Sequence, residues 1–249
     1  MILRGLQDAL VKTVSADRDL IQCGVFTLML TSGESSPWLN YAVPTDASAP
    51  LEKSIDEMEA AFEARERRPR LEIIVDLWPT VVEALISRGY TSEMHVPLML
   101  VTPQRPVVEP RLIDEVRLLG PQGDFGPGIA CGGAAFADDE TVTEAAIERT
   151  RNGVVSGRLL VAQIERDGKV VGSGVAVGDD QVREIAGIGT RPEYRRQGIA
   201  SAVSEALVRA HFARGGEIAW LTAGDDAAEA VYAGLGFERA GSQINLSKP

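Results

Sequence analysis

A proline-rich segment near the middle of the chain is the strongest constraint on how this sequence can fold. Residues 102–110 read TPQRPVVEP, and such a stretch neither continues a helix nor donates a regular ladder of hydrogen bonds. It follows an apolar run at 96–101 and precedes a new strand-like start at 115–118. We therefore predict two domains, residues 1–102 and 113–249, joined by a proline-rich linker at 103–112.

The composition is that of an ordinary soluble protein. Of the 249 residues, 45% are hydrophobic and 24% are charged, and no apolar run approaches the ~20 residues that span a bilayer. The N-terminal residues lack the basic-then-apolar order of a secretory signal. These features predict a cytoplasmic protein with no membrane partner.

The formal net charge is -11. A surface this acidic repels phosphate backbones, so nucleic acid is not expected as a partner. It suits a cationic small molecule better, although acidic residues also serve solubility alone.

The cysteines and histidines lie far apart in the sequence. Cys23 and Cys131 form no Cys-x-x-Cys pair, and neither has a histidine close by. No disulfide framework and no metal site is therefore expected. We interpret both cysteines, together with His95 and His211, as structural residues.

The second half of the chain shows a regular succession of elements. An Asp-Gly pair at 167–168 indicates a tight hairpin turn between two strands. Glycines at 215–216 and 236 indicate where two helices end. We predict strands at 159–164, 170–177, 182–190, 218–222 and 244–246, and helices at about 198–214 and 225–235. This order predicts a mixed, mostly antiparallel α/β sheet flanked by helices.

Part of that order recurs in the first half. A strand at 71–75 precedes a helix at 79–87 with proline in its first turn, and Gly89-Tyr90 then leads into another strand. Residues 217–237 give the same sequence of strand, helix and glycine-aromatic pair. The first half is therefore interpreted as a degenerate relative of the second.

A turn at residues 190–201 has the chemistry of an anion site. A strand ends there, Arg195 and Arg196 follow, and Gly198 opens a helix whose first turn is small. Helix N-termini present unpaired N–H groups and the positive end of the helix dipole. Gly198 places no Cβ in the way of a pyrophosphate.

These residues resemble the GNAT superfamily of acetyltransferases. Arg195-x-x-Gly198-x-Ala200 is similar to the family signature Arg/Gln-x-x-Gly-x-Gly/Ala, and residues 225–237 resemble the family's late helix, with Asp225 where asparagine is usual. The resemblance covers about 115–246. It implies two tandem GNAT-like lobes, the first one degenerate, and acetyl-CoA as co-substrate without a metal. The implied cofactor-binding residues are Ile188, Gly189, Thr190, Arg195, Arg196, Gln197, Gly198, Ile199, Ala200, Ser201 and Asp225.

The glycine-rich stretch at 172–178 superficially suggests a dinucleotide-binding loop. That fingerprint needs a strand before it and a helix after it, whereas this stretch sits inside a predicted hairpin strand. We reject the dinucleotide interpretation.

Two catalytic residues follow from the resemblance. Tyr232 would give a proton to the departing thiolate, and Glu184 would remove a proton from the amine, directly or through water. Strand alternation places Glu184 on one face with Ala186 and Ile188, unless a bulge occurs at Gly187 or Gly189. An ordinary helix tyrosine and an exposed strand carboxylate are the alternatives.

The expected activity is transfer of an acetyl group to a primary amine of a small molecule by direct attack in a ternary complex. Alternatives are a protein or peptide N-acetyltransferase, or a non-catalytic acyl-CoA-binding regulatory domain. The family commonly forms dimers, so a homodimer is compatible with the resemblance. The first half has Leu85 where the second has Tyr232, and we expect it to bind no acyl-CoA productively.

Overall fold

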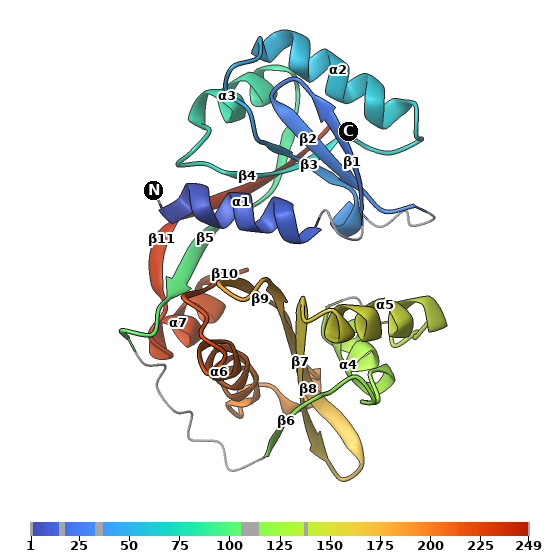
Figure 1. Cartoon of the computed structure of the whole chain (residues 1–249), viewed down its shortest axis with the longest axis vertical. Coiled ribbons are helices and arrows are strands. Elements are labelled where there is room, and N and C mark those ends of the chain that lie inside the picture. Colours follow the sequence, from blue (N-terminus) through green and yellow to red (C-terminus); the bar gives the residue numbers. More distant parts are fainter. Residues whose placement is uncertain (1, 15–17, 33–36, 106–114, 137–138, 249) are drawn as a thin grey trace. The chain divides into compact units, whose positions relative to one another are not determined.

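The structure is a computed structural model that describes the chain apart from residues 1, 15–17, 33–36, 106–114, 137–138 and 249. The chain divides into two compact units (Figure 1). The first comprises Met1–Leu98 and Arg239–Pro249, and the second comprises Met99–Glu238. Most of the predicted linker, from residue 106 onward, lies outside the described residues.

The sheet of the first unit includes the last strand of the chain. Its strand order is β1-β2-β3-β4-β11-β5, in which β3 and β4 are parallel and β4 and β11 are antiparallel. The predicted domains, 1–102 and 113–249, stay a sequence-based prediction; the contacts group residues 239–249 with the first unit because β11 pairs with β4. The strands are β1 Asp19–Cys23, β2 Phe26–Leu30, β3 Tyr41–Pro44, β4 Arg70–Ile74, β5 Thr91–Val101 and β11 Glu238–Ser247.

Helices cover both faces of this first sheet. Helices α2 (Leu51–Glu63) and α3 (Pro79–Ser87) bury Phe62 and Leu85 against strand residues such as Leu71. Helix α1 (Ile2–Val14) packs Val11 on the other face, against Met29, Tyr41 and Val43. The helix predicted at 79–87 is therefore confirmed, and Pro79 stands at its start, where a missing N–H costs no hydrogen bond.

The predicted internal repeat is confirmed at the level of single hydrogen bonds. Elements β4, α3 and β5 have the same order as β10, α7 and β11. The Tyr90 N–H donates to the Leu85 carbonyl at 3.1 Å, and the Phe237 N–H donates to the Tyr232 carbonyl at 3.0 Å. Both helices thus end in the same manner, and Leu85 occupies the position that corresponds to Tyr232.

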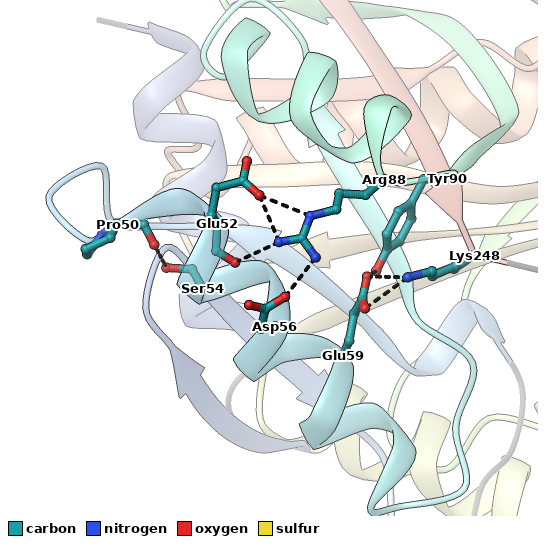
Figure 2. A network of polar contacts seen from close by, with 8 residues as sticks. All are labelled: Pro50, Glu52, Ser54, Asp56, Glu59, Arg88, Tyr90 and Lys248. Carbon is teal, nitrogen blue, oxygen red and sulfur yellow. Dashed lines mark hydrogen bonds and ion pairs between the residues drawn. The ribbon is translucent and has the colours of Figure 1, made fainter.

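A polar network fastens the end of β11 within the first unit (Figure 2). Lys248 Nζ contacts both Glu59 carboxylate oxygens at 2.9 and 3.0 Å, and the Tyr90 hydroxyl donates to Glu59 at 3.2 Å. Arg88 bridges Glu52 and Asp56 on the same helix, each at 2.8 Å. The C-terminal segment is thereby held to α2 as well as to β4.

The second unit contains the hairpins predicted from the sequence. Its strand order is β5-β10-β9-β8-β7-β6, to which β5 contributes its last residues. All neighbouring pairs from β6 to β9 are antiparallel, whereas β9 and β10 are parallel. The strands are β6 Val116–Leu118, β7 Leu159–Arg166, β8 Lys169–Gly178, β9 Val182–Thr190 and β10 Ile218–Thr222. The mixed, mostly antiparallel sheet is confirmed.

Asp167 and Gly168 form the predicted two-residue turn. Their φ angles are 51° and 77°, and Arg166 pairs with Lys169 across the hairpin, which matches the twist that flanking strands favour. The glycine-rich stretch at 172–178 lies wholly within β8. It is therefore part of a strand and not a phosphate-binding loop, as predicted.

Helices also cover both faces of the second sheet. On one face, α6 (Ile199–Phe212) packs Val203 and Leu207 onto Ile185, and α7 (Asp226–Gly234) packs Ala228 and Tyr232 against the same cluster. On the other face lies α4 (Gly126–Phe136), and α5 (Glu144–Val155) follows it in the chain. The Ser173 hydroxyl on β8 donates to the Gly128 carbonyl of α4 at 2.9 Å. Within the described part of the chain, no helix is both long enough and apolar enough to cross a membrane.

Candidate active site

Strand β9 carries a bulge at Gly187 and Ile188. Ser173 of β8 is matched with Gly189 and Val175 with Ala186, so one residue of β8 faces two residues of β9. Gly187 has a φ of 59°, which glycine adopts without the strain a side chain would bring. The bulge reverses the side-chain alternation for the rest of the strand.

Strands β9 and β10 are matched over three residue pairs, of which Glu184 and Trp220 form the last. Strand β9 then continues to Thr190 and β10 to Thr222, with no further matched pair in the described lengths of these two strands. Beyond the Glu184–Trp220 pair, this edge of β9 is therefore not matched by β10, and an extended ligand can pair with an unmatched strand edge.

The turn after β9 presents backbone N–H groups at the start of α6. Gly198 is the residue before the helix, its φ is 82°, and no side chain caps the helix end. The first N–H bonded within the helix is that of Ala202, which donates to the Gly198 carbonyl at 3.0 Å. The N–H groups of residues 199–201 have no hydrogen-bond acceptor within the helix, because no helical turn precedes the first residues of an α-helix.

The side chains of this turn are mostly exposed, and two of them touch neighbouring elements. Arg195 donates to the Ala135 carbonyl at 3.0 Å and to the Thr190 carbonyl at 3.5 Å. Gln197 accepts a hydrogen bond from Arg166 at 2.5 Å. Arg196 is exposed and has a φ of 61°, a region that few non-glycine residues occupy.

The first residues of α6 differ in exposure. Ile199 is buried in the core of the second unit, while Ala200 and Ser201 are half-buried. The side chain of Ile199 therefore anchors the helix to the sheet. The small residues that follow leave the backbone at the helix end accessible.

Three predicted residues close β9. Beyond the bulge, Ile188 packs against the core cluster beneath α6. Gly189 faces α4, where an added Cβ would come within 3.1 Å of Ala135 Cβ. The Thr190 hydroxyl is buried and has no hydrogen-bond partner among the described residues.

Glu184 and Ile188 lie on opposite faces of the sheet. Glu184 is matched with Trp220, so both side chains lie on the face away from Ile185 and the α6 core. The bulge turns Ile188 to the α6 face. The expectation that Glu184 shares a face with Ile188 holds for an unbulged strand, and the bulge at Gly187 removes it. Ala186 stays on the Glu184 face, because it precedes the bulge.

Tyr232 lies on α7 and is half-buried against the α6 core cluster. Its ring meets Phe237 edge-on, with centroids 5.9 Å apart. Burial raises the pKa of Tyr232 to about 12, the Ser204 hydroxyl opposes this rise, and the Asp225 carboxylate adds to it. The phenol is therefore protonated at neutral pH and can act as a proton donor.

Asp225 caps α7. Its carboxylate accepts a hydrogen bond from the Ala228 N–H at 2.7 Å, the usual role of Asp at the residue before a helix. The side chain that replaces the family's usual asparagine is thus engaged by its own helix.

Sequence reasoning did not single out Arg191 or Glu140. Arg191 is buried, contacts both carboxylate oxygens of Glu140 at 2.6 and 2.8 Å, and donates to the Val170 carbonyl at 2.9 Å. These hydrogen bonds lower the pKa of Glu140. The pair ties the segment after α4 to the base of the Gly198 turn. Arg191 and Glu140 are 51 positions apart, so no local sequence pattern predicts this ion pair.

The first unit lacks the features of this site at the corresponding positions. Leu85 is fully buried, and the largely exposed Trp38 ring lies over the guanidinium of Arg70, with 4.5 Å between the Arg70 Cζ and the ring centroid. Surface cavities of about 490 and 290 Å³ lie in this unit, beside α1 and beside Arg65, and neither is lined by a predicted site residue. The described residues hold no group of three or more side chains able to bind a metal ion.

Comparison with known proteins also indicates the GNAT family. The model of the "Acetyltransferase (GNAT) family" matches residues 134–237, which include both the Gly198 turn and Tyr232. No curated protein is similar enough in sequence to count as a match.

Solved structures share the fold over almost the whole chain. A GCN5-related N-acetyltransferase from Kribbella flavida is 23% identical with a TM-score of 0.79, covering 100% of this chain and 96% of that one. One from Sphaerobacter thermophilus is 14% identical with a TM-score of 0.66, covering 99% and 91%. A tandem GNAT protein from the clavulanic acid biosynthesis pathway is 14% identical with a TM-score of 0.63, covering 90% and 78%. At these identities the likeness establishes the fold. Through residues 134–237, the chain carries a domain of the GNAT acetyltransferase family.

Proposed function

We propose that this protein transfers the acetyl group of acetyl-CoA to a primary amine of a small molecule by direct attack in a ternary complex. The observation that supports this most is the unmatched edge of β9 beyond the Glu184–Trp220 pair. The turn that follows β9 leads into the N-terminus of α6, which no side chain caps, and Tyr232 on α7 carries a protonated phenol.

The residues present fit coenzyme A, which supplies the acetyl group as an activated thioester. The amides of residues 199–201, together with the guanidinium of Arg196, would bind the diphosphate. A Cβ on Gly198 would narrow that approach. The backbone edge of Ile188 and Thr190 would bind the pantetheine arm in the manner of an added strand, and Gly189 allows close contact there.

Glu184 and Tyr232 would divide the proton transfers. The amine must lose a proton to attack, and Glu184 would accept it, directly or through water. The leaving thiolate gains a proton from Tyr232, whose raised pKa keeps the phenol protonated throughout the neutral range. Glu184 lies on the face of the sheet away from the α6 core, whereas Tyr232 packs against that core, so one would serve the amine and the other the sulfur.

The acceptor proposed here is a small amine that is cationic in solution. The net charge of -11 favours the approach of such a molecule. The first unit, with Leu85 in place of the phenol, would not perform this chemistry itself.

The test combines calorimetry with a thiol-release assay. We expect coenzyme A and acetyl-CoA to bind the purified chain, and acetyl-CoA to release free thiol in the presence of some members of a panel of small amines. Release with peptides alone would indicate a peptide acetyltransferase. Tight binding without release from any amine or peptide would indicate a regulatory domain, and no binding at all would refute the proposal.

A further inference from the structure

The buried hydroxyl of Ser204, in the helix that packs with α7, has no hydrogen-bond partner among the described residues. Ser204 lies on α6, its relative exposure is 0%, and its Oγ makes no hydrogen bond with any described residue. Leaving a buried hydroxyl unsatisfied is unfavourable, and such atoms are rare in native proteins. An unsatisfied group of this kind calls for a physical explanation.

The ordinary explanation for a helical serine does not apply. Serine in a helix usually donates to the carbonyl four residues earlier, as Ser87 does to Glu83 at 2.9 Å in α3. Ser204 makes no such bond, although the Ala200 carbonyl stands at the equivalent position. Its hydroxyl is therefore available to another group.

The group on which the Ser204 hydroxyl acts is the phenol of Tyr232. Helices α6 and α7 lie next to each other (Figure 1), and Tyr232 packs against the core cluster to which α6 contributes Val203. Among the groups that act on the Tyr232 phenol, the Ser204 hydroxyl is the one that stabilises the ionised form, whereas burial and Asp225 oppose it. The Ser204 hydroxyl therefore acts on the phenol, yet its Oγ meets full hydrogen-bond geometry with none of the described residues.

We infer that Ser204 is a positioning residue for Tyr232, whose hydroxyl turns to donate to the phenolic oxygen as the phenol gives up its proton. The inference rests on the proposed function. In that step the Tyr232 proton passes to the thiolate sulfur, and the electron pair of the broken O–H bond remains on the phenolic oxygen. Ser204 keeps its own proton and donates a hydrogen bond to the new anion, which solvent later reprotonates.

The chemistry explains why the hydroxyl is left free beforehand. A hydrogen bond to a charged group is stronger than one between neutral groups. A donor that is unsatisfied in the resting state and satisfied in the transition state therefore lowers the barrier without stabilising the ground state. A serine already bonded to a helix carbonyl would lose that bond first.

The experiment is a double-mutant cycle with Ser204→Ala and Tyr232→Phe, using an amine that the wild-type protein acetylates. Ser204→Ala should lower kcat by about ten- to a hundredfold and leave KM for acetyl-CoA within about twofold. In the Tyr232→Phe background, the same change should have almost no further effect. Ser87→Ala, which removes a satisfied helical hydroxyl from α3 of the first unit, should leave kcat unchanged.

A second measurement does not depend on turnover. Because Ser204→Ala removes an unsatisfied hydroxyl, its Tm should equal or exceed that of the wild type, and its calorimetric affinity for coenzyme A should be unchanged. A fall in Tm of several degrees would identify Ser204 as a structural residue and overturn the inference.

Two outcomes separate this inference from the function it rests on. If the wild type turns over but Ser204→Ala lowers kcat equally in both backgrounds, Ser204 does not act through Tyr232 and only the inference fails. If the wild type releases no thiol with any acceptor, the proposed function fails and the inference fails with it.

Discussion

Glu184 on β9 stands directly beside Trp220 on β10, and this is the last matched pair between the two strands. The carboxylate of Glu184 thus lies where the matched pairing ends, and the buried Trp220 is its neighbour on the same face. A group at this point can reach a ligand that pairs with the unmatched edge of β9.

Replacing Glu184 with glutamine tests its role as a base. We expect kcat to fall by about 10²–10⁴-fold, the usual contribution of general base catalysis, with the affinity for coenzyme A unchanged. Glu165→Gln is the matched control, because Glu165 lies on β7, which β8 separates from β9, in an exposed ion pair with Arg117. A Glu184→Gln protein that kept full kcat at every pH would show that another group takes the proton.

Gly198→Val should abolish measurable binding of coenzyme A. At a φ of 82° a side chain costs roughly 1–2 kcal/mol, and it also obstructs the amides of residues 199–201. Gly215→Val is the control, since Gly215 has a φ of 90° beyond the opposite end of the same helix and an added Cβ there meets no atom within 4 Å. Both variants should lose similar stability in urea. Equal loss of binding in both by calorimetry would contradict the assignment.

Gly174→Ala should destabilise the second unit. A Cβ at this position of β8 would lie 2.3 Å from Ile188 Cδ1 and 2.9 Å from Val203 Cγ1, so the bulged end of β9 and α6 would have to move. Overpacking of this kind costs about 1–3 kcal/mol, and urea unfolding would measure it. Gly120→Ala adds a Cβ in open space and should be nearly neutral; an equally neutral Gly174→Ala would mean that α6 adjusts freely.

His211 should make the second unit sensitive to acid. Burial lowers the pKa of His211 from 6.5, and Arg183 lowers it further. The unfolded chain therefore binds a proton at His211 near pH 6.5, whereas the folded chain binds it only at lower pH. The contribution of His211 to the free energy of unfolding is fully present above pH 6.5 and is lost as the pH falls below it. The slope is at most about 1.4 kcal/mol per pH unit. His211→Gln should flatten the pH dependence of the free energy of unfolding, measured with urea between pH 7 and 5, whereas His95→Gln should retain it. A slope that survives His211→Gln would indicate that another group binds the proton.

The elements that the sequence predicted well are those with strong local signals. The Asp167-Gly168 turn, Pro79 at the start of α3 and Gly236 after α7 each restrict the backbone by their own chemistry. Helix α4, by contrast, reads GPGIACGGAAF, and glycine and proline disfavour helices. It forms because small residues such as Gly128 and Cys131 let it lie close to β8, which is a tertiary effect that no local pattern contains.

The candidate site divides in the same way. The Gly198 turn and Tyr232 were recognisable because they belong to continuous motifs. The bulge at Gly187, which separates the faces of Glu184 and Ile188, depends on pairing with β8, and glycine alone could mark either 187 or 189 as its place. The sequence did not single out Ser204, because its proposed role depends on a buried hydroxyl that has no hydrogen-bond partner among the described residues. No sequence pattern reveals this.

Strand β11 makes the folding of the first unit depend on the order in which the chain is synthesised. Its residues are inserted between β4 and β5, yet a ribosome makes them after every residue of the second unit. The sheet of the first unit therefore cannot be completed until residue 247 has been synthesised, because β11 must pair between β4 and β5. The unit whose synthesis starts first is thus the last to finish folding.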